Sequence, residues 1–304
     1  IFIYMKTNYS SYIESFQEYL AVDLNYSSKT VLTYVQCLKK YEEYLYSKNI
    51  NFLNINSSLA NSYKAYLISL NYEPKTSSLY LSAVRAFYAY LVEIKALNIN
   101  PFANMKNPKV IKKLPNFLSE SETNHMFDNI NYEDDLEVRN SLIVEFLYAT
   151  GLRVSELCML KIEDLNTSNY TLRVMGKGSK ERIVFYKACD FKLLNQYLTK
   201  SRPDILNGLT SPYLFVSKRG QNLTTRSVEK IVQDFSRKRG IKSKVTPHTM
   251  RHTYATGLLN NGADIRSVGE LLGHESLSTT QIYTHVTSER LKSVYNKTHP
   301  RTKK

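Results

Sequence analysis

The chain has 304 residues, a length that allows two domains with separate hydrophobic cores. Lys and Arg number 41 against 27 Asp and Glu, and this net charge of +14 favours a polyanionic partner, either nucleic acid or an anionic membrane surface. A membrane-spanning chain is not expected, because the apolar runs are far shorter than the roughly 20 residues that a spanning helix needs. The cysteines Cys37, Cys158 and Cys189 are widely spaced and form no C-x-x-C pair. They therefore predict neither a disulfide framework nor a thiolate metal site, and they indicate a reducing, cytoplasmic setting.

The first part of the chain predicts a small helical domain over residues 1–100. Apolar periodicity and polar turns predict four helices, at about 10–23, 28–47, 57–70 and 75–96. Residues 101–115 follow, with three prolines, lysines between them and no sustained periodicity. We expect this segment to be a basic interdomain linker.

Residues 116–304 predict a second, mainly helical domain that contains a small β-hairpin. The run Ser119–Glu122 is typical of a capped helix start, and residues 140–149 read as a buried helix. Two short strands are expected at 170–175 and 182–186, around the turn 176–179. Further helices are expected at about 187–200, 224–239, 247–261, 264–272, 278–284 and 287–296.

Two basic residues lie at predicted turns. Gly151 permits a sharp turn before Arg153, and Ser155 and Glu156 suit a helix beginning, so Arg153 should stand at a helix N-terminus, where an anion is favoured. Pairing of Arg153 with Glu156 alone is the alternative.

Lys177 lies between two glycines at the hairpin tip, where it can protonate a departing oxygen or simply be a solvated lysine. The spacing of a nucleotide-binding phosphate loop is absent.

Two histidine-containing segments follow. Thr246 and Pro247 open a helix whose first turns carry His248, Arg251 and His252 on one face. These side chains can converge on one phosphate oxygen; zinc binding is the alternative, but no third ligand is evident and an arginine beside the metal would be repulsive.

Farther along, His274 follows the helix-ending Gly273, and Tyr283 lies nine residues beyond it on an expected short helix. Taken alone, one tyrosine among 24 carries little weight.

Together these contexts resemble the tyrosine recombinase (phage integrase) family, and within it the bacterial Xer-type recombinases. The resemblance extends over residues 10–301 and is strongest over 248–286, where H-T-M-R-H-T-Y-A-T, N-G-A-D-I-R-S-V, L-L-G-H and T-T-Q-I-Y-T-H-V follow the family pattern. Met250 replaces a more usual leucine, a volume-conserving change.

The resemblance assigns roles to six residues. It implies that Arg153 and Arg251 clamp the scissile phosphate, assisted by His248 and His274, that Tyr283 is the nucleophile, and that Lys177 is the general acid. His248 is the candidate base for Tyr283, because a phenol of pKa about 10 needs deprotonation or a positive field. The implied reaction is transesterification through a 3′-phosphotyrosyl bond, without metal, ATP or other cofactor.

The resemblance also implies a fold and partners. An N-terminal four-helix core-binding (SAM-like) domain and a C-terminal catalytic domain would form a C-shaped clamp around double-stranded DNA that carries a palindromic recombination site. A homotetramer, or a heterotetramer with a second recombinase, would assemble there, and a septal DNA translocase is a candidate partner. The stripe Leu291, Val294 and Tyr295 is expected to pack in trans on a neighbouring subunit, with folding back on its own domain as the alternative.

Several functions remain open at this point. The compact length favours Xer-type chromosome dimer resolution, while a mobile-element integrase, a phase-variation invertase, a topoisomerase-like relaxing activity and a noncatalytic DNA-binding protein of the same fold are alternatives. Surface residues that could contact DNA are Lys29, Thr30, Arg85, Arg173, Arg226 and Lys230.

Overall fold

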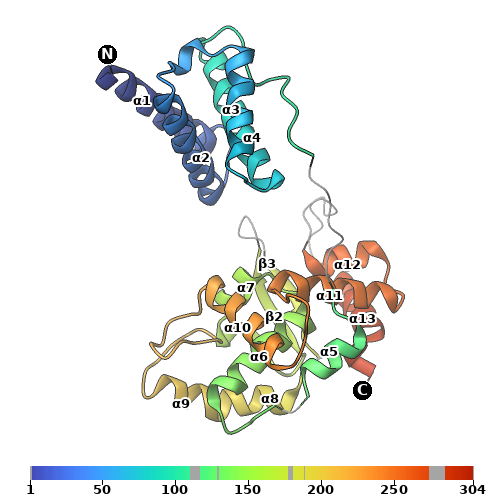
Figure 1. Ribbon diagram of the computed structural model, residues 1–304. Coiled ribbons are helices and arrows are strands. Elements are labelled where there is room, and N and C mark those ends of the chain that lie inside the picture. The colour runs from blue at the N-terminus through green and yellow to red at the C-terminus, as the bar shows by residue number, and fades with distance from the viewer. Residues whose placement is uncertain are drawn as a thin grey trace. The chain divides into compact units, whose positions relative to one another are not determined.

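The computed structural model describes residues 2–109, 117–128, 130–176, 181–187, 189–273 and 285–303. The chain divides into two compact units, Ile1–Lys113 and Leu114–Lys304, whose helices and strands are labelled in Figure 1. Each unit has its own cluster of buried apolar side chains. The two units are therefore described one at a time.

Within residues 2–109, the first unit contains four α-helices and one short 3-10 turn. They are α1 (Phe2–Val22), α2 (Ser28–Ser47), η1 (Phe52–Asn54), α3 (Ser57–Ser69) and α4 (Pro74–Glu93). Helix α2 packs against both α1 and α4, and α3 packs against α4. The four expected helices are present, but α1 begins well before residue 10.

Aromatic rings fill the core of this unit. Phe87 makes edge-to-face contacts with Tyr9 and Phe16, at centroid distances of 5.7 and 5.5 Å. The buried Tyr88 hydroxyl lies 3.0 Å from that of Tyr41 and donates to the Phe52 carbonyl at 2.8 Å. These hydroxyls thus satisfy their hydrogen-bonding needs inside an apolar core.

The beginning of the expected linker belongs to the first unit. Phe102 is fully buried in its core. Arg85, on α4, donates to the carbonyls of Phe102 and Met105 at 3.0 and 2.6 Å and to the Asn107 side chain at 2.9 Å. Residues 102–107 are therefore fixed to α4, and the linker role of residues 101–115 stays a prediction.

The second unit is mainly helical, with a small antiparallel sheet of order β1-β2-β3. In this sheet Leu172 of β2 stands opposite Leu165 of β1 and Val184 of β3. Strands β2 and β3 confirm the expected hairpin, whereas the two-residue β1 was not expected. The elements are α5 (Glu120–Met126), α6 (Asp135–Thr150), α7 (Val154–Met159), η2 (Ile162–Asp164), β1 (Leu165–Asn166), β2 (Thr171–Met175), β3 (Glu181–Phe185), α8 (Phe191–Gln196), η4 (Tyr197–Ser201), α9 (Arg202–Leu206), α10 (Thr225–Lys238), α11 (Pro247–Asn260), α12 (Ile265–Leu272), α13 (His285–Thr298) and η6 (Pro300–Lys303).

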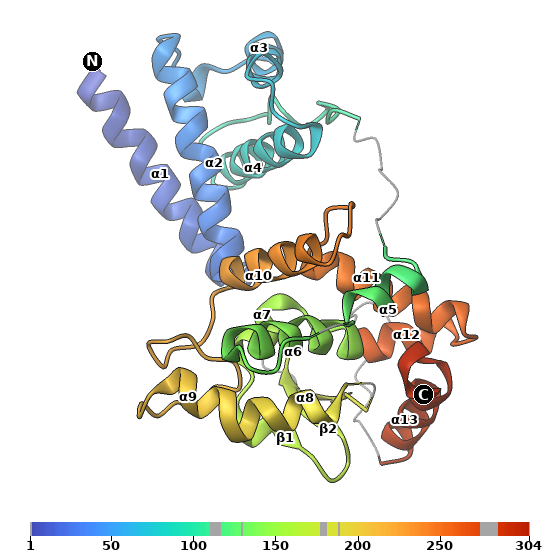
Figure 2. The same ribbon diagram turned by 60° about the horizontal axis from the view of Figure 1, so that its bottom comes forward.

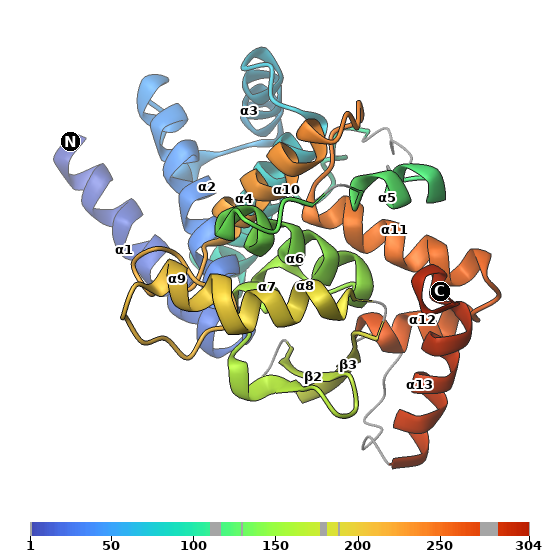
Figure 3. The same cartoon turned by 90° about the horizontal axis from the view of Figure 1, so that it is seen from below.

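Helix α6 is the centre of the second unit. It packs against α8, α9, α10, α11 and β3, and nearly all of its side chains from Val138 onward are buried. Figures 2 and 3 show α10 and α11 on one side of α6 and α8 and α9 on the other. Helix α11 also packs against α12, and Arg251 of α11 donates to the carbonyls of Gly151 and Leu272, so segments from distant parts of the sequence come together at the C-terminus of α6.

The helix expected at 187–200 begins later and ends later in the structure. It starts at Phe191, where the Asp190 side chain accepts from the amides of Lys192 and Leu193. It then continues through a π-helical turn into α9, which ends at Leu206. Proline at position 203 cannot donate a backbone hydrogen bond, and the wide turn before it accommodates this loss.

The final helix packs on its own domain in this single chain. Leu291 and Tyr295 of α13 are buried, and the Tyr295 hydroxyl donates to the Ala149 carbonyl at 2.9 Å. After α13, Arg301 forms an ion pair with the buried Glu145 at 2.5 Å. The single chain thus has the alternative arrangement, in which the helix folds back on its own domain, and packing on a neighbouring subunit stays a prediction. The helix expected at 278–284 lies outside the described residues.

Candidate active site

The turn after α6 places Arg153. Gly151 ends the helix in the left-handed conformation, with φ of 63°, and a Cβ there would lie 2.5 Å from the Tyr254 ring. Both the backbone angle and the lack of space require glycine. Arg153 then caps the N-terminus of α7, as the sequence predicted.

The second expected arginine reaches the same turn from α11. That helix begins as expected, with Thr246 as N-cap and Pro247 in its first turn. Arg251 donates from Nη1 to the Gly151 carbonyl at 2.6 Å and from Nη2 to the Leu272 carbonyl at 2.7 Å. Burial, together with the positive charge of Arg153, lowers the pKa of Arg251 to about 10, so its guanidinium remains charged at neutral pH.

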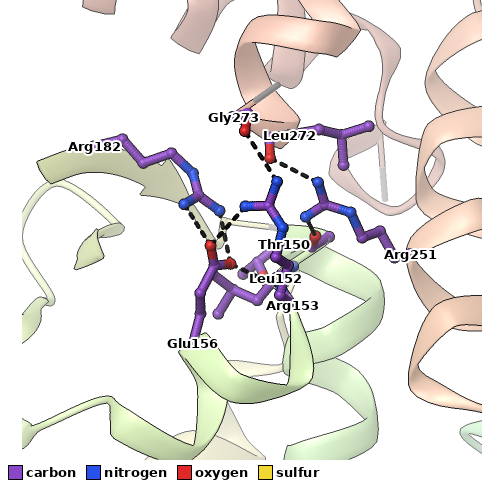
Figure 4. Close-up of polar contacts among 9 residues, drawn as sticks. Thr150, Leu152, Arg153, Glu156, Arg182, Arg251, Leu272 and Gly273 are labelled. Carbon is purple, nitrogen blue, oxygen red and sulfur yellow. Dashed lines mark hydrogen bonds and ion pairs between the residues drawn. The ribbon is translucent and has the colours of Figure 1, made fainter. Parts of the chain in front are cut away.

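The end of α12 completes the arrangement. Gly273 ends this helix with φ of 67°, as its expected cap role requires, and its carbonyl accepts from Nη2 of Arg153 at 3.1 Å. Arg153 and Arg251 thus donate to the carbonyls of Gly273 and Leu272, two consecutive residues (Figure 4).

A third arginine, Arg182, lies beside Arg153 and was not singled out from the sequence. Arg153, Arg182, Arg251 and Glu156 are called the arginine cluster below. The Nη1 and Nη2 atoms of Arg182 donate to the two carboxylate oxygens of Glu156 at 2.8 and 2.9 Å. Only 7% of the Arg182 side chain and 6% of the Glu156 side chain are exposed. The signal was present in strand periodicity, because Arg182 lies two residues before the buried Val184, on the inward face of β3.

Glu156 links this arginine to Arg153. Its oxygens also accept from Nη1 of Arg153 at 2.9 Å and from the Arg153 backbone amide at 2.8 Å. Burial acts to raise the pKa of the Glu156 carboxyl, but the hydrogen bonds and charges of Arg182 and Arg153 outweigh it and lower the pKa. The pairing of Arg153 with Glu156 that the sequence left as an alternative is thus present, in addition to its convergence with Arg251.

The predicted site histidine of α11 is at the surface. His248 and His252 are exposed on α11, and no group of three His, Cys, Asp or Glu side chains in the described parts of the chain could hold a metal ion. Lys177, His274 and Tyr283 lie outside the described residues, so their predicted roles are not tested.

The additional DNA-contact candidates occupy different surroundings. Lys29, Arg226 and Lys230 are exposed in helices α2 and α10. Thr30 is partly buried, and its backbone amide donates to the side chain of Ser27 at 3.2 Å. Arg173 is exposed on β2, 3.4 Å from Asp164, and Arg85 holds the segment after α4 as described above. Their DNA contacts remain predictions.

No helix in the described ranges combines the length and hydrophobicity that crossing a bilayer requires.

Two family models match most of the chain. Residues 116–290 match the phage integrase family, and residues 13–95 match the N-terminal SAM-like domain of phage integrases. These ranges fall in the second and the first compact unit, respectively.

Curated relatives are similar over nearly the whole chain. A protein named tyrosine recombinase XerC from Halalkalibacterium halodurans is 39% identical, with 98% of this chain and 100% of the relative covered. One named tyrosine recombinase XerD from Shewanella oneidensis is 37% identical, with 95% and 96% covered. The chain is thus about equally similar to a relative named XerC and to one named XerD.

Solved structures of recombinases bound to DNA share the fold. The XerH site-specific recombinase bound to a palindromic difH substrate, in a post-cleavage complex, has a TM-score of 0.71 at 26% identity, with 93% of this chain and 83% of that chain covered. Lambda integrase residues 75–356, a dimer on a core site, has a TM-score of 0.67 at 17% identity, with 91% and 98% covered, a likeness that concerns the fold alone. With both family models matched and curated relatives aligned over almost their full length, the chain belongs to the phage integrase family and is a Xer-type tyrosine recombinase, an enzyme of site-specific DNA recombination.

Proposed function

We propose that this enzyme cuts and rejoins DNA through Tyr283, with Arg153 and Arg251 binding the scissile phosphate. The observation that carries the proposal is the convergence of the two arginines on the Leu272–Gly273 carbonyls, directly before His274. Guanidiniums that meet from α7 and α11 can bind two oxygens of one phosphate and stabilise the charge that develops in a five-coordinate transition state. His248, His274 and Lys177 complete the proposed site.

The proposed chemistry is a transesterification. Tyr283 gives its phenol proton to His248 and its oxygen attacks phosphorus, so that a 3′-phosphotyrosyl bond forms while the bond to the 5′ oxygen breaks and Lys177 gives that oxygen a proton. The 5′-hydroxyl of a partner strand then loses its proton and attacks the phosphotyrosine, which restores a phosphodiester, breaks the bond to the Tyr283 oxygen and returns that oxygen to its protonated form. The bond energy is retained in the covalent link, so the cycle needs neither ATP nor a metal ion.

The proposed biological role is chromosome dimer resolution in the cytoplasm at a palindromic site. This role is supported by relatives named XerC and XerD and by the palindromic difH substrate of the XerH complex. A tetramer on two DNA sites, formed with itself or with a second recombinase, and a septal translocase that controls it belong to the same proposal.

The first test is formation of a covalent adduct on a nicked duplex that carries a candidate site. We expect the wild-type chain, incubated with chelator and without metal, to give an adduct stable in a denaturing gel, and Tyr283→Phe to give none. Tyr46→Phe, which changes an exposed tyrosine on α2, serves as the control and should behave as wild type.

Two results would contradict the proposal. An adduct that persists in Tyr283→Phe would mean that another residue is the nucleophile. Specific binding to a site without an adduct, also when a second Xer-type chain from the same cell is added, would favour a noncatalytic DNA-binding role.

A further inference from the structure

The buried carboxylate of Glu156 has all of its hydrogen-bonding capacity occupied. A carboxylate has about four lone-pair positions. Arg182 fills two of them, and the side chain and the backbone amide of Arg153 fill the other two. The charge is therefore fully compensated, although almost none of the Glu156 side chain is exposed.

The two arginines hold Glu156 in different ways. Arg182 makes the two-point contact that a guanidinium and a carboxylate favour, and it is buried. Arg153 makes a single contact from its side chain and remains 40% exposed. Its second terminal nitrogen, Nη2, is thereby directed to the Gly273 carbonyl instead of to Glu156.

Arg182 also lies against Gly273, the residue at the end of α12 whose carbonyl accepts from Arg153. A Cβ on Gly273 would lie 3.0 Å from both Cδ and Nε of Arg182. The Arg182 side chain is thus wedged between α7 and the end of α12, and it comes from β3, the second strand of the hairpin. Arg182 of β3 therefore lies against both α7 and the end of α12, the two elements with which the Arg153 side chain forms hydrogen bonds (Figure 4).

We propose that Arg182 is a positioning residue for strand cleavage. This proposal rests on the function proposed above. By occupying both oxygens of Glu156, Arg182 prevents a two-point pair between Glu156 and Arg153. The Arg153 guanidinium then stays directed to the Leu272–Gly273 turn, beside Arg251, where the phosphate binds.

Charge supports the same conclusion. Arg153, Arg182 and Arg251 bring three positive charges, and the positive charges of Arg153 and Arg182 both act on Arg251. The negative charge of Glu156 offsets one of these three positive charges. A phosphodiester carries one negative charge and its five-coordinate transition state two, so a change in the positive charge of the arginine cluster affects the transition state more than DNA binding.

The experiment compares the effect of Arg182→Met in two backgrounds of the full-length chain, wild type and Glu156→Gln. The rate of adduct formation is measured in a single turnover on the nicked duplex, and affinity is measured on the intact duplex. We expect Arg182→Met to slow adduct formation about tenfold or more and to change affinity by less than about threefold, because the freed carboxylate captures Arg153. In the Glu156→Gln background the same substitution should slow the reaction at least about fivefold less.

An equal loss in both backgrounds would overturn the proposal, because Arg182 would then act independently of Glu156. A wild-type rate for Arg182→Met would also overturn it. If Arg182→Met fails to fold, Arg182→Lys replaces it in the same cycle. Lysine keeps the charge but not the two-point contact, so a cleavage defect that Glu156→Gln relieves is again expected.

A second measurement needs no DNA and thus separates this proposal from the proposed function. The rate at which phenylglyoxal modifies Arg153 is followed by peptide mass spectrometry in the same variants. We expect Arg153 to be modified severalfold more slowly in Arg182→Met than in wild type, and protection to disappear when Glu156→Gln is added. Unchanged or faster modification of Arg153 in Arg182→Met would contradict its capture by Glu156, whether or not the wild-type chain forms an adduct.

Discussion

Gly151 determines how closely α6 and α11 approach at the site. It has φ of 63°, and a Cβ would meet Cδ1 and Cε1 of the buried Tyr254 at 2.5 and 2.8 Å. Gly151→Ala therefore adds a clash to backbone strain, and we expect it to lower the free energy of unfolding by about 2 to 4 kcal/mol. Because the Gly151 carbonyl accepts from Arg251, adduct formation should slow as well.

The matched control for this substitution is Gly240→Ala. Gly240 has φ of 72°, but no atom lies within 4 Å of its missing Cβ. Only the backbone strain remains there, about 1 to 2 kcal/mol. Urea unfolding of both variants checks the prediction, and equal losses would show that the Tyr254 contact does not matter.

At the scale of single residues, sequence context located those arginines that stand beside turns or helix starts. Arg153 follows a turn glycine and Arg251 follows a Thr-Pro helix start, so local spacing carried the signal. Arg182 was missed because its partners, Glu156 and Gly273, are far away along the chain and only the fold brings them together. The alternation of residues along β3 indicates that Arg182 faces the interior, but it does not indicate which residues Arg182 contacts there.

At the scale of elements, the segment after α13 carries a buried histidine. The His299 ring is fully buried among Tyr148, Tyr254 and Tyr295. Its Nδ1 accepts from the Arg301 amide at 3.2 Å, which leaves Nε2, 3.4 Å from the Tyr148 carbonyl, as the donor of a neutral ring. Burial lowers the pKa of His299 to about 3.

Glu145, on α6, has the opposite shift. Burial raises its pKa to about 7, against the opposing effect of Arg301, with which it forms the ion pair. Thus one small cluster contains a histidine that resists protonation and a carboxyl group that favours it.

These two shifts predict opposite pH slopes. Between pH 6.5 and 4.5 the unfolded chain protonates His299 and the folded chain does not, so stability falls as the pH is lowered, by about 1.4 kcal/mol per pH unit. Over the same range the folded chain protonates Glu145 and the unfolded chain does not, so stability rises by a similar amount as the pH is lowered. In wild type the two contributions oppose each other.

Single substitutions should separate the slopes. Relative to wild type, His299→Phe should become more stable as the pH falls from 6.5 to 4.5, and Glu145→Gln should become less stable, since all other groups are shared. Urea unfolding at three pH values in this range provides the measurement. Parallel pH profiles for the three proteins would mean that neither group titrates as its burial predicts.

Helix starts were the elements best predicted from sequence, because caps are local. Thr246 with Pro247 and Ser119 with Glu122 mark starts that the structure contains. Strand β1 has only two residues and no period to detect, and its pairing depends on β2, which lies later in the chain. Likewise, Phe102 lies in a proline-containing stretch without periodicity, and its burial is determined by α4 and its neighbours.

At the scale of the whole molecule, the chain carries two hydrophobic cores that share no residue. Their composition differs, since aromatic rings dominate the first and α6 organises the second. The sequence indicated two domains from length and from the prolines between helical stretches, and the net charge of +14 agreed with a polyanionic partner. How the cores fill could not be predicted, because packing depends on contacts between distant elements.

Separate cores predict separate responses to core substitutions. Phe87 in the first unit and Phe146 in the second are both fully buried, and Phe146 packs on Tyr186 and Phe215 at 5.7 and 5.6 Å. Replacing either with Ala should cost about 3 to 5 kcal/mol in its own unit, because a cavity remains where the ring was. In scanning calorimetry we expect two transitions, of which Phe87→Ala lowers one and Phe146→Ala the other. If both substitutions lowered one common transition together, the units would unfold cooperatively, and the stability of the second unit would then depend on the core of the first.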